Sequence, residues 1–207
     1  MHVNLLCNAS SVFKAGFTTD HFEESNRRSM DLIDDDVDSV DRLVQWLYTK
    51  TYTISPFDCE EHANERFHQL ARLNTFADKY GIHALSQNVI SRLGEPHMES
   101  WRIPPFPPRM SVVAYVYDNT SERSEFRKMM VEWYTWGIPM RWYNDKETRD
   151  DLLGVSKDFS VDLAIALGQK SAFLRRQGPF RPKRVHHKDL QSQGIDSDDE
   201  EGYCCNK

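Results

Sequence analysis

Apolar residues recur at intervals of three and four through the first 93 residues, and this spacing limits the fold more than any other feature of the sequence. Such spacing places apolar side chains on one face of an α-helix. The clearest stripe consists of Val37, Val40, Leu43, Val44 and Leu47. It predicts a helix that begins at the acidic run 34–36, whose carboxylates suit a helix start, and ends near Tyr48.

Three further helices are predicted in the same region: one that ends near Thr18, one from near Glu60 to Tyr80, and one from Ile82 to Leu93. Gly81 lies between the last two, where glycine commonly caps a helix C-terminus. The brief apolar segment from Met30 to Ile33 predicts a short strand. Helices of this kind bury their apolar faces against one another, so residues 5–93 are expected to close into one small core.

Prolines interrupt the helical pattern and predict a linker over residues 95–110. They stand at positions 96, 104, 105, 107 and 108. Beyond them, the apolar segment from Val112 to Tyr117 fits a strand or a helix, since periodicity alone does not separate the two. A helical stripe follows from Phe126 to Trp133, and a last helix is predicted from Asp158 to Leu167. We therefore expect a helical extension over residues 111–170.

The composition changes near Arg175, where a basic block and then an acidic block follow with few apolar residues. Such a segment does not bury enough apolar surface to offset its ordering entropy, so residues 171–207 are predicted to be disordered. A candidate nuclear localisation signal consists of Arg175, Arg176, Lys183 and Arg184, with a merely solvated tail as the equal alternative. Ser197 precedes a run of carboxylates and is a candidate phosphorylation site.

Charge and motif content exclude several classes of function. The net charge of -6 and the lack of zinc-finger spacing argue against direct reading of nucleic acid. The four cysteines form no C-x-x-C pair, which favours reduced thiols in the nucleus or cytoplasm. The sequence contains no run of about 18 apolar residues, so no membrane-spanning helix is expected.

We expect no catalysis, cofactor or metal. The sequence lacks a G-x-S-x-G elbow, a P-loop, a G-x-G-x-x-G turn and an H-E-x-x-H pair. His62 and His68 lie six residues apart and do not share a helix face as an i, i+4 pair would, so both are interpreted as solvated or capping histidines. The acidic run 34–36 is interpreted as a helix start in preference to a metal-binding cluster. His2 is interpreted as structural because no acid is identifiable to orient it toward Cys7.

Several segments of the first 93 residues also resemble, in a fixed order, the BTB/POZ domain in the version common among fungal proteins. They are His2–Cys7, Ser11–Phe17, Phe22–Ser25, Met30–Leu32, Val44–Thr49 and Ala77–Ile82. The resemblance implies an α+β fold that is helix-dominated here: a BTB/POZ-like helical cluster over residues 1–94 with a residual short sheet, plus the helical extension. Val113–Thr120 resembles a segment that follows the domain in such proteins, which implies that Val112 to Tyr117 is helical.

The resembled family begins with two strands ahead of its first histidine, whereas Met1 directly precedes His2 here. We therefore expect that the first strands are missing from this sequence, as in an N-terminally truncated domain. Those strands would pair with the remaining strand and cover the helices. Their loss would expose a sheet edge and apolar surface.

The resemblance also implies a non-catalytic adaptor that binds other proteins, with self-association as a homodimer as one form of this. The candidate partner-binding residues are Phe22, Tyr48, Tyr52, Gln69 and Leu70. One alternative is a substrate adaptor of a cullin-based ubiquitin ligase. The expected cullin-contact triplet, 69–71, has neither the hydrophobic first residue nor the acidic third one. The other alternative is a nuclear, transcription-associated factor that uses the basic block.

Overall fold

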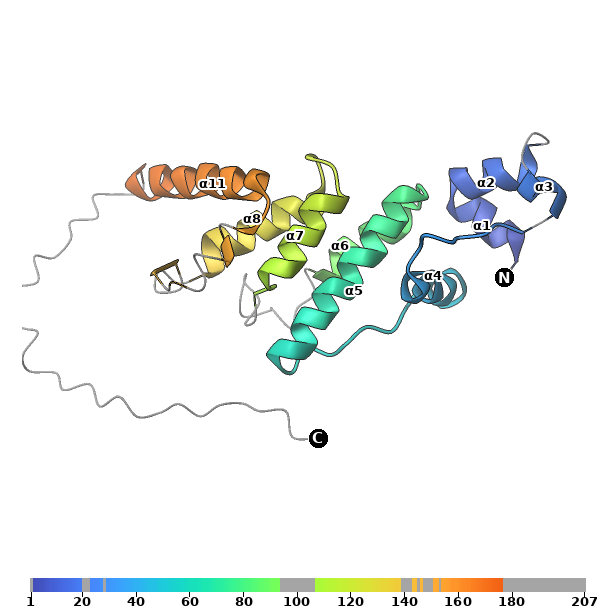
Figure 1. Cartoon of the computed structure of the whole chain (residues 1–207), viewed down its shortest axis with the longest axis horizontal. Helices are drawn as coiled ribbons and strands as arrows, with labels where there is room; N and C mark the ends of the chain where they lie inside the picture. Colours follow the sequence, from blue (N-terminus) through green and yellow to red (C-terminus); the bar gives the residue numbers. More distant parts are fainter. Residues whose placement is uncertain are drawn as a thin grey trace, which may run out of the picture.

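The computed structural model describes residues 2–19, 23–27, 29–93, 107–138, 143–144, 146, 151–152 and 154–176. Over these residues the chain is built from helices that succeed one another along an elongated body, with α1 near one end and α11 at the other (Figure 1). In chain order they are α1 (Val3–Ala9), α2 (Ser11–Thr18), α3 (Glu23–Arg27), α4 (Val37–Thr49), α5 (Glu60–Lys79), α6 (His83–Leu93), α7 (Met110–Asn119), α8 (Glu125–Gly137) and α11 (Lys157–Arg176). None of the described helices has the length and apolarity needed to cross a lipid bilayer.

The starts of α2 and α4 are fixed by side-chain caps. The Ser10 hydroxyl accepts a hydrogen bond from the amide of Phe13 at 3.1 Å and donates one to the carbonyl of Tyr80 at 2.5 Å. Asp36 accepts hydrogen bonds from the amide and the hydroxyl of Ser39. The prediction that the acidic run begins a helix is therefore confirmed, because Asp36 is the N-cap residue of α4 and its carboxylate accepts from an amide of the first turn.

The C-terminus of α5 has the glycine cap that the sequence predicts. Gly81 has a φ of 62°, in the left-handed region that glycine adopts without steric cost. The amide of Ile82 donates to the carbonyl of Ala77 at 2.8 Å, and the amide of Gly81 donates to that of Asp78 at 3.1 Å. This pair of hydrogen bonds is a Schellman motif. It turns the chain from α5 directly into α6.

The short strand expected from Met30 to Ile33 is not confirmed. Residues 29–32 are irregular, and a turn follows over residues 33–35. None of the described residues lies in a strand, so the structure gives no support to the residual sheet. The described residues show only the helical part of the expected α+β fold.

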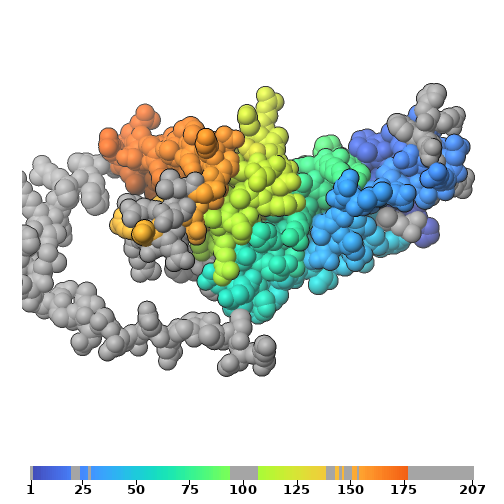
Figure 2. All heavy atoms as spheres, in the orientation of Figure 1, coloured from blue at the N-terminus to red at the C-terminus, as the bar shows by residue number. Residues whose placement is uncertain are grey.

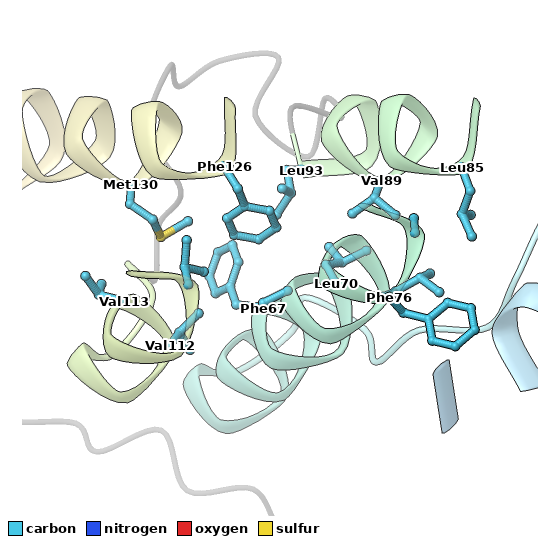
Figure 3. Packing of buried hydrophobic residues seen from close by; sticks show 14 of the residues in the cluster. Phe67, Leu70, Phe76, Leu85, Val89, Leu93, Val112, Val113, Phe126 and Met130 are labelled. Carbon is cyan, nitrogen blue, oxygen red and sulfur yellow. The ribbon is translucent and has the colours of Figure 1, made fainter. Parts of the chain in front are cut away.

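The extension is helical, and α7 resolves the segment from Val112 to Tyr117 in favour of a helix. Its side chains join the same core as those of the N-terminal segment. Figure 3 shows side chains of α5, α6, α7 and α8 converging on one another, with Phe67 of α5 facing the extension. The ring centroids of Phe67 and Trp133 of α8 lie 5.3 Å apart. One continuous core thus spans both sides of the proline-rich segment.

The last described helix is longer than the sequence predicts. We expected it to end near Leu167 and the extension to end at residue 170, but α11 continues to Arg176. Its buried side chains, Phe159 and Leu163, lie in its first half. Residues 171–176 are all exposed, which explains why apolar periodicity did not indicate the full length of α11.

Candidate functional site

Large apolar side chains are exposed at the end of the molecule built from α1, α2 and α4. They are Val12, Ile33, Val37 and Tyr48, with exposed fractions of 43%, 88%, 72% and 49%. Ile33 and Val37 flank the cap of α4, and Tyr48 lies near its C-terminus. Isolated exposed apolar residues are common, but four of them on α2, on α4 and on the loop before α4 make this end of the molecule a candidate contact surface.

Tyr48 is held in place by His2. The Tyr48 hydroxyl lies 2.9 Å from Nδ1 of His2, and the two rings meet edge to face with centroids 6.0 Å apart. Both side chains are exposed. This contact joins α1 to α4 and orients an exposed tyrosine, which fits a structural role for His2.

The segment that leads into α4 is fixed to the end of α5. Lys79 Nζ donates to Asp35 Oδ1 at 2.9 Å, and the Tyr80 hydroxyl donates to Asp35 Oδ2 at 2.5 Å. The side chain of Asp35 is almost fully buried, with an exposed fraction of 7%. Burial, together with this hydrogen bond to a carboxylate, raises the pKa of Tyr80. The exposed Ile33 thus lies on a loop that Asp35, two residues further along the chain, fixes to the end of α5.

The comparison with protein families identifies this part of the chain. The family model described as the BTB/POZ domain matches residues 1–94. Residues 1–94 are therefore similar to BTB/POZ domains. BTB/POZ is a family of protein-interaction domains that is generally non-enzymatic. No curated protein matches the chain.

Two of the predicted partner-binding residues of the BTB/POZ domain are in its interior, which corrects the prediction. Leu70 is fully buried and Tyr52 is 5% exposed. The Arg92 guanidinium lies 4.6 Å from the Tyr52 ring centroid and donates to the Tyr52 carbonyl at 2.8 Å. Of the remaining predicted residues, Tyr48 is exposed, whereas Phe22 lies outside the described residues.

Gln69 is half-buried and engaged in the structure. Its carbonyl oxygen accepts from the Ser55 amide at 2.9 Å, and its amide nitrogen donates to the Ser55 hydroxyl at 3.0 Å. The triplet 69–71 therefore fixes the loop before α5 through Gln69 and fills the core through Leu70 and Ala71. The triplet presents no apolar side chain to a cullin partner.

A cluster at the start of α5 was missed in the sequence. Asp58, Cys59 and His62 bring a carboxylate oxygen, a thiol sulfur and an imidazole nitrogen within 4.8 Å of one another. Asp58 Oδ1 and His62 Nδ1 lie 2.7 Å apart, and this hydrogen bond is the main cause that lowers the pKa of Asp58. The signal that could have revealed it is the spacing of Asp58 and His62, which stand four residues apart where α5 begins.

A groove of about 550 Å³ lies between α8 and α11, at the opposite end of the molecule from α1, α2 and α4. Its lining includes the partly exposed rings of Trp136 and Phe173, and the Lys170 ammonium lies 4.6 Å from the Trp136 ring centroid. Lys170 also donates to the carbonyl of Thr135 at 2.6 Å. These contacts dock α11 on α8.

The candidate sites near the C-terminus are only partly described. Arg175 and Arg176 are exposed in the last turn of α11, where cationic side chains complement the helix dipole. Lys183, Arg184 and Ser197 lie outside the described residues.

Proposed function

We propose that the chain is a protein-interaction adaptor whose BTB/POZ domain binds its partner through the exposed end formed by α1, α2 and α4. The observation that carries this proposal is the set of exposed apolar side chains defined above, Val12, Ile33, Val37 and Tyr48. We call these four residues the α2/α4 surface. Large, conformationally restricted aromatic groups such as a tethered tyrosine serve well as anchors in interfaces.

The position of the extension supports the choice of this end. In Figure 1, α7, α8 and α11 lie on one side of α5 and α6, whereas α1 to α4 lie on the other. Figure 2 shows the same division, with the atoms of α5 and α6 between the two ends. The extension thus covers one side of the BTB/POZ domain and leaves the α2/α4 surface free. A stable interface needs roughly 800 Å² from each partner, so residues around these four would contribute as well.

A charge substitution on the α2/α4 surface tests the proposal. Ile33→Asp combined with Val37→Asp places carboxylates at two exposed positions four residues apart. The matched control is Val161→Asp combined with Ile165→Asp on α11, where the exposed fractions are 57% and 55%. Both pairs are exposed, so neither double variant should unfold the protein. Circular dichroism and thermal denaturation check that expectation.

The readout is affinity purification of the tagged full chain from cells, followed by quantitative mass spectrometry. We expect a set of proteins that co-purify with the wild-type chain and with the α11 control. The same proteins should be depleted at least about tenfold with the Ile33→Asp/Val37→Asp variant, which corresponds to a loss of roughly 1.4 kcal/mol in binding free energy. Equal recovery by all three chains would contradict the proposal. A cullin in the depleted set would identify the chain as a ubiquitin-ligase substrate adaptor.

The partner can also be a second copy of the chain. Light scattering of the purified protein over a range of concentrations measures the dimer directly. If the α2/α4 surface forms a homodimer, the Ile33→Asp/Val37→Asp variant is monomeric at concentrations where the wild-type chain and the α11 control are dimeric. The same comparison on a chain extended upstream by two strands would test the predicted truncation.

Localisation is a separate proposal that rests on the exposed pair Arg175 and Arg176 together with the basic residues beyond them. We propose that this block directs the chain to the nucleus. Fluorescence microscopy of a tagged chain tests it. Neutralising Arg175, Arg176, Lys183 and Arg184 should abolish nuclear accumulation, and an unchanged distribution would contradict the proposal.

A further inference from the structure

The start of α5 brings three kinds of metal-binding group together within five consecutive residues. Asp58 and Cys59 immediately precede the helix, and His62 lies in its first turn. The carboxylate oxygen, the thiol sulfur and the imidazole nitrogen lie within 4.8 Å of one another. This convergence is separate from the α2/α4 surface and from the groove between α8 and α11.

Local backbone structure explains the convergence. Cys59 occupies the N-cap position in an extended conformation, with φ of −147° and ψ of 170°, and its side chain makes no capping hydrogen bond. Asp58 and His62 are four residues apart, so the first turn of the helix brings their side chains to the same side. Their 2.7 Å contact shows that the carboxylate and the imidazole already face each other.

We propose that Asp58, Cys59 and His62 bind a divalent transition-metal cation of the Zn²⁺ class. Thiolate, imidazole and carboxylate are the ligands that Zn²⁺ takes in proteins. Bond lengths of about 2.0–2.3 Å in a tetrahedral site put ligand atoms roughly 3.3–3.6 Å apart. The observed separations of up to 4.8 Å therefore need side-chain movements of only about 1 Å.

The exposure of the cluster permits such movement and leaves room for a fourth ligand. Asp58 and His62 are exposed and Cys59 is half-buried, so their side chains can change rotamer without disturbing the core. Three protein ligands with an open fourth position leave that position to water or to a donor from another molecule.

The local charge favours a cation on balance. The positive N-terminal end of the helix dipole opposes cation binding. The carboxylates of Asp58, Glu60 and Glu61 favour cation binding, although Glu60 is paired with Arg109 at 3.0 Å. A bound cation would replace the hydrogen bond between Asp58 and His62 and would join the residues before α5 to its first turn.

Titration of the full chain with Co²⁺ under reducing conditions tests the site, because a thiolate bound to Co²⁺ gives a charge-transfer band in the near ultraviolet. We expect the band to appear with the wild-type chain and to disappear when Zn²⁺ is added in competition. Cys59→Ser should abolish the band, since serine retains the size of the side chain but not the thiolate. His62→Gln and Asp58→Asn should each weaken binding by about tenfold or more.

The chain offers a matched control because it holds other cysteines and histidines. A variant with Cys204→Ser, Cys205→Ser, His186→Gln and His187→Gln removes the competing donors near the C-terminus and should keep the band unchanged. Circular dichroism confirms that each variant is folded. The proposal is overturned if the wild-type chain gives no band, if the band survives Cys59→Ser, or if the control variant loses it.

Discussion

The ring centroid of Phe67 lies 5.3 Å from that of Trp133, and this contact joins the BTB/POZ domain to the helical extension. Phe67 is 2% exposed and Trp133 is 5% exposed. Because the two side chains belong to one continuous core, the domain and the extension are expected to unfold together. The first prediction follows from this relationship.

Trp133→Ala should lower the free energy of unfolding by about 3–5 kcal/mol, the usual cost of removing a large buried aromatic side chain. The same substitution at Trp136, three residues along α8 and 44% exposed, is the control and should cost about 1 kcal/mol or less, mainly through the contact of its ring with Lys170. Urea denaturation followed by circular dichroism measures both. If the wild-type chain unfolded in two separate transitions, the single core would be contradicted.

Asp35 and Tyr80 give a second prediction. Tyr80→Phe removes the hydroxyl that donates to the Asp35 carboxylate at 2.5 Å and leaves the ring in place. A hydrogen bond to a charged group contributes roughly 1.5–3 kcal/mol, and we expect a loss in stability of that order. Tyr48→Phe, which removes an exposed hydroxyl bonded to His2, is the control and should cost less. Equal losses would show that burial of Asp35 does not strengthen the bond.

The local structure of the N-terminal segment could be predicted because its signals are local. The apolar stripe of α4, its cap at Asp36 and the glycine after α5 depend on residues within a few positions of one another. Periodicity and cap chemistry therefore place these helices correctly. The alternative readings of Val112 to Tyr117 needed information from outside the segment, since a short apolar run suits both kinds of element.

The features that escaped prediction depend on how helices pack. Leu70 and Tyr52 were expected at the surface, but both face the interior, because α6 and α7 pack on α5 and Arg92 covers the ring of Tyr52. The prolines in residues 95–110 indicated a boundary in sequence, yet the core crosses it through Phe67 and Trp133. Local patterns do not specify which helix faces come together across such a segment.

Gly81→Ala tests the cap at the end of α5. An alanine forced to a φ of 62° incurs a steric cost of roughly 1–2 kcal/mol, so stability should fall by about that amount. Gly168→Ala is the matched control, since a Cβ added to this glycine of α11 meets nothing within 4 Å. It should stabilise the chain by roughly 0.5–1 kcal/mol through helix propensity. Thermal denaturation of the two variants should therefore shift in opposite directions.

His68 lies where α5 meets α7, and its Nε2 is 3.2 Å from the Ser111 hydroxyl. Partial burial lowers the pKa of His68 below its ordinary value of 6.5, and the nearby charge of Arg72 adds to this effect, while Glu65 opposes it. The neutral imidazole is thus favoured in the folded chain. In the unfolded chain the same histidine takes up its proton at about pH 6.5.

This difference makes packing of α7 on α5 sensitive to acid. Since the pKa of His68 is lower in the folded state, the unfolded state binds more protons as the pH falls below 6.5. The contribution of His68 to stability is therefore complete above that pH and is lost as the pH falls toward the folded-state pKa. His68→Gln, which does not titrate, should remove this part of the pH dependence. The urea midpoints of the wild-type chain and the His68→Gln variant should be measured between about pH 5 and 8. The two midpoints should approach each other as the pH falls, because the wild-type chain loses more stability. Parallel curves would show that His68 is equally easy to protonate in both states.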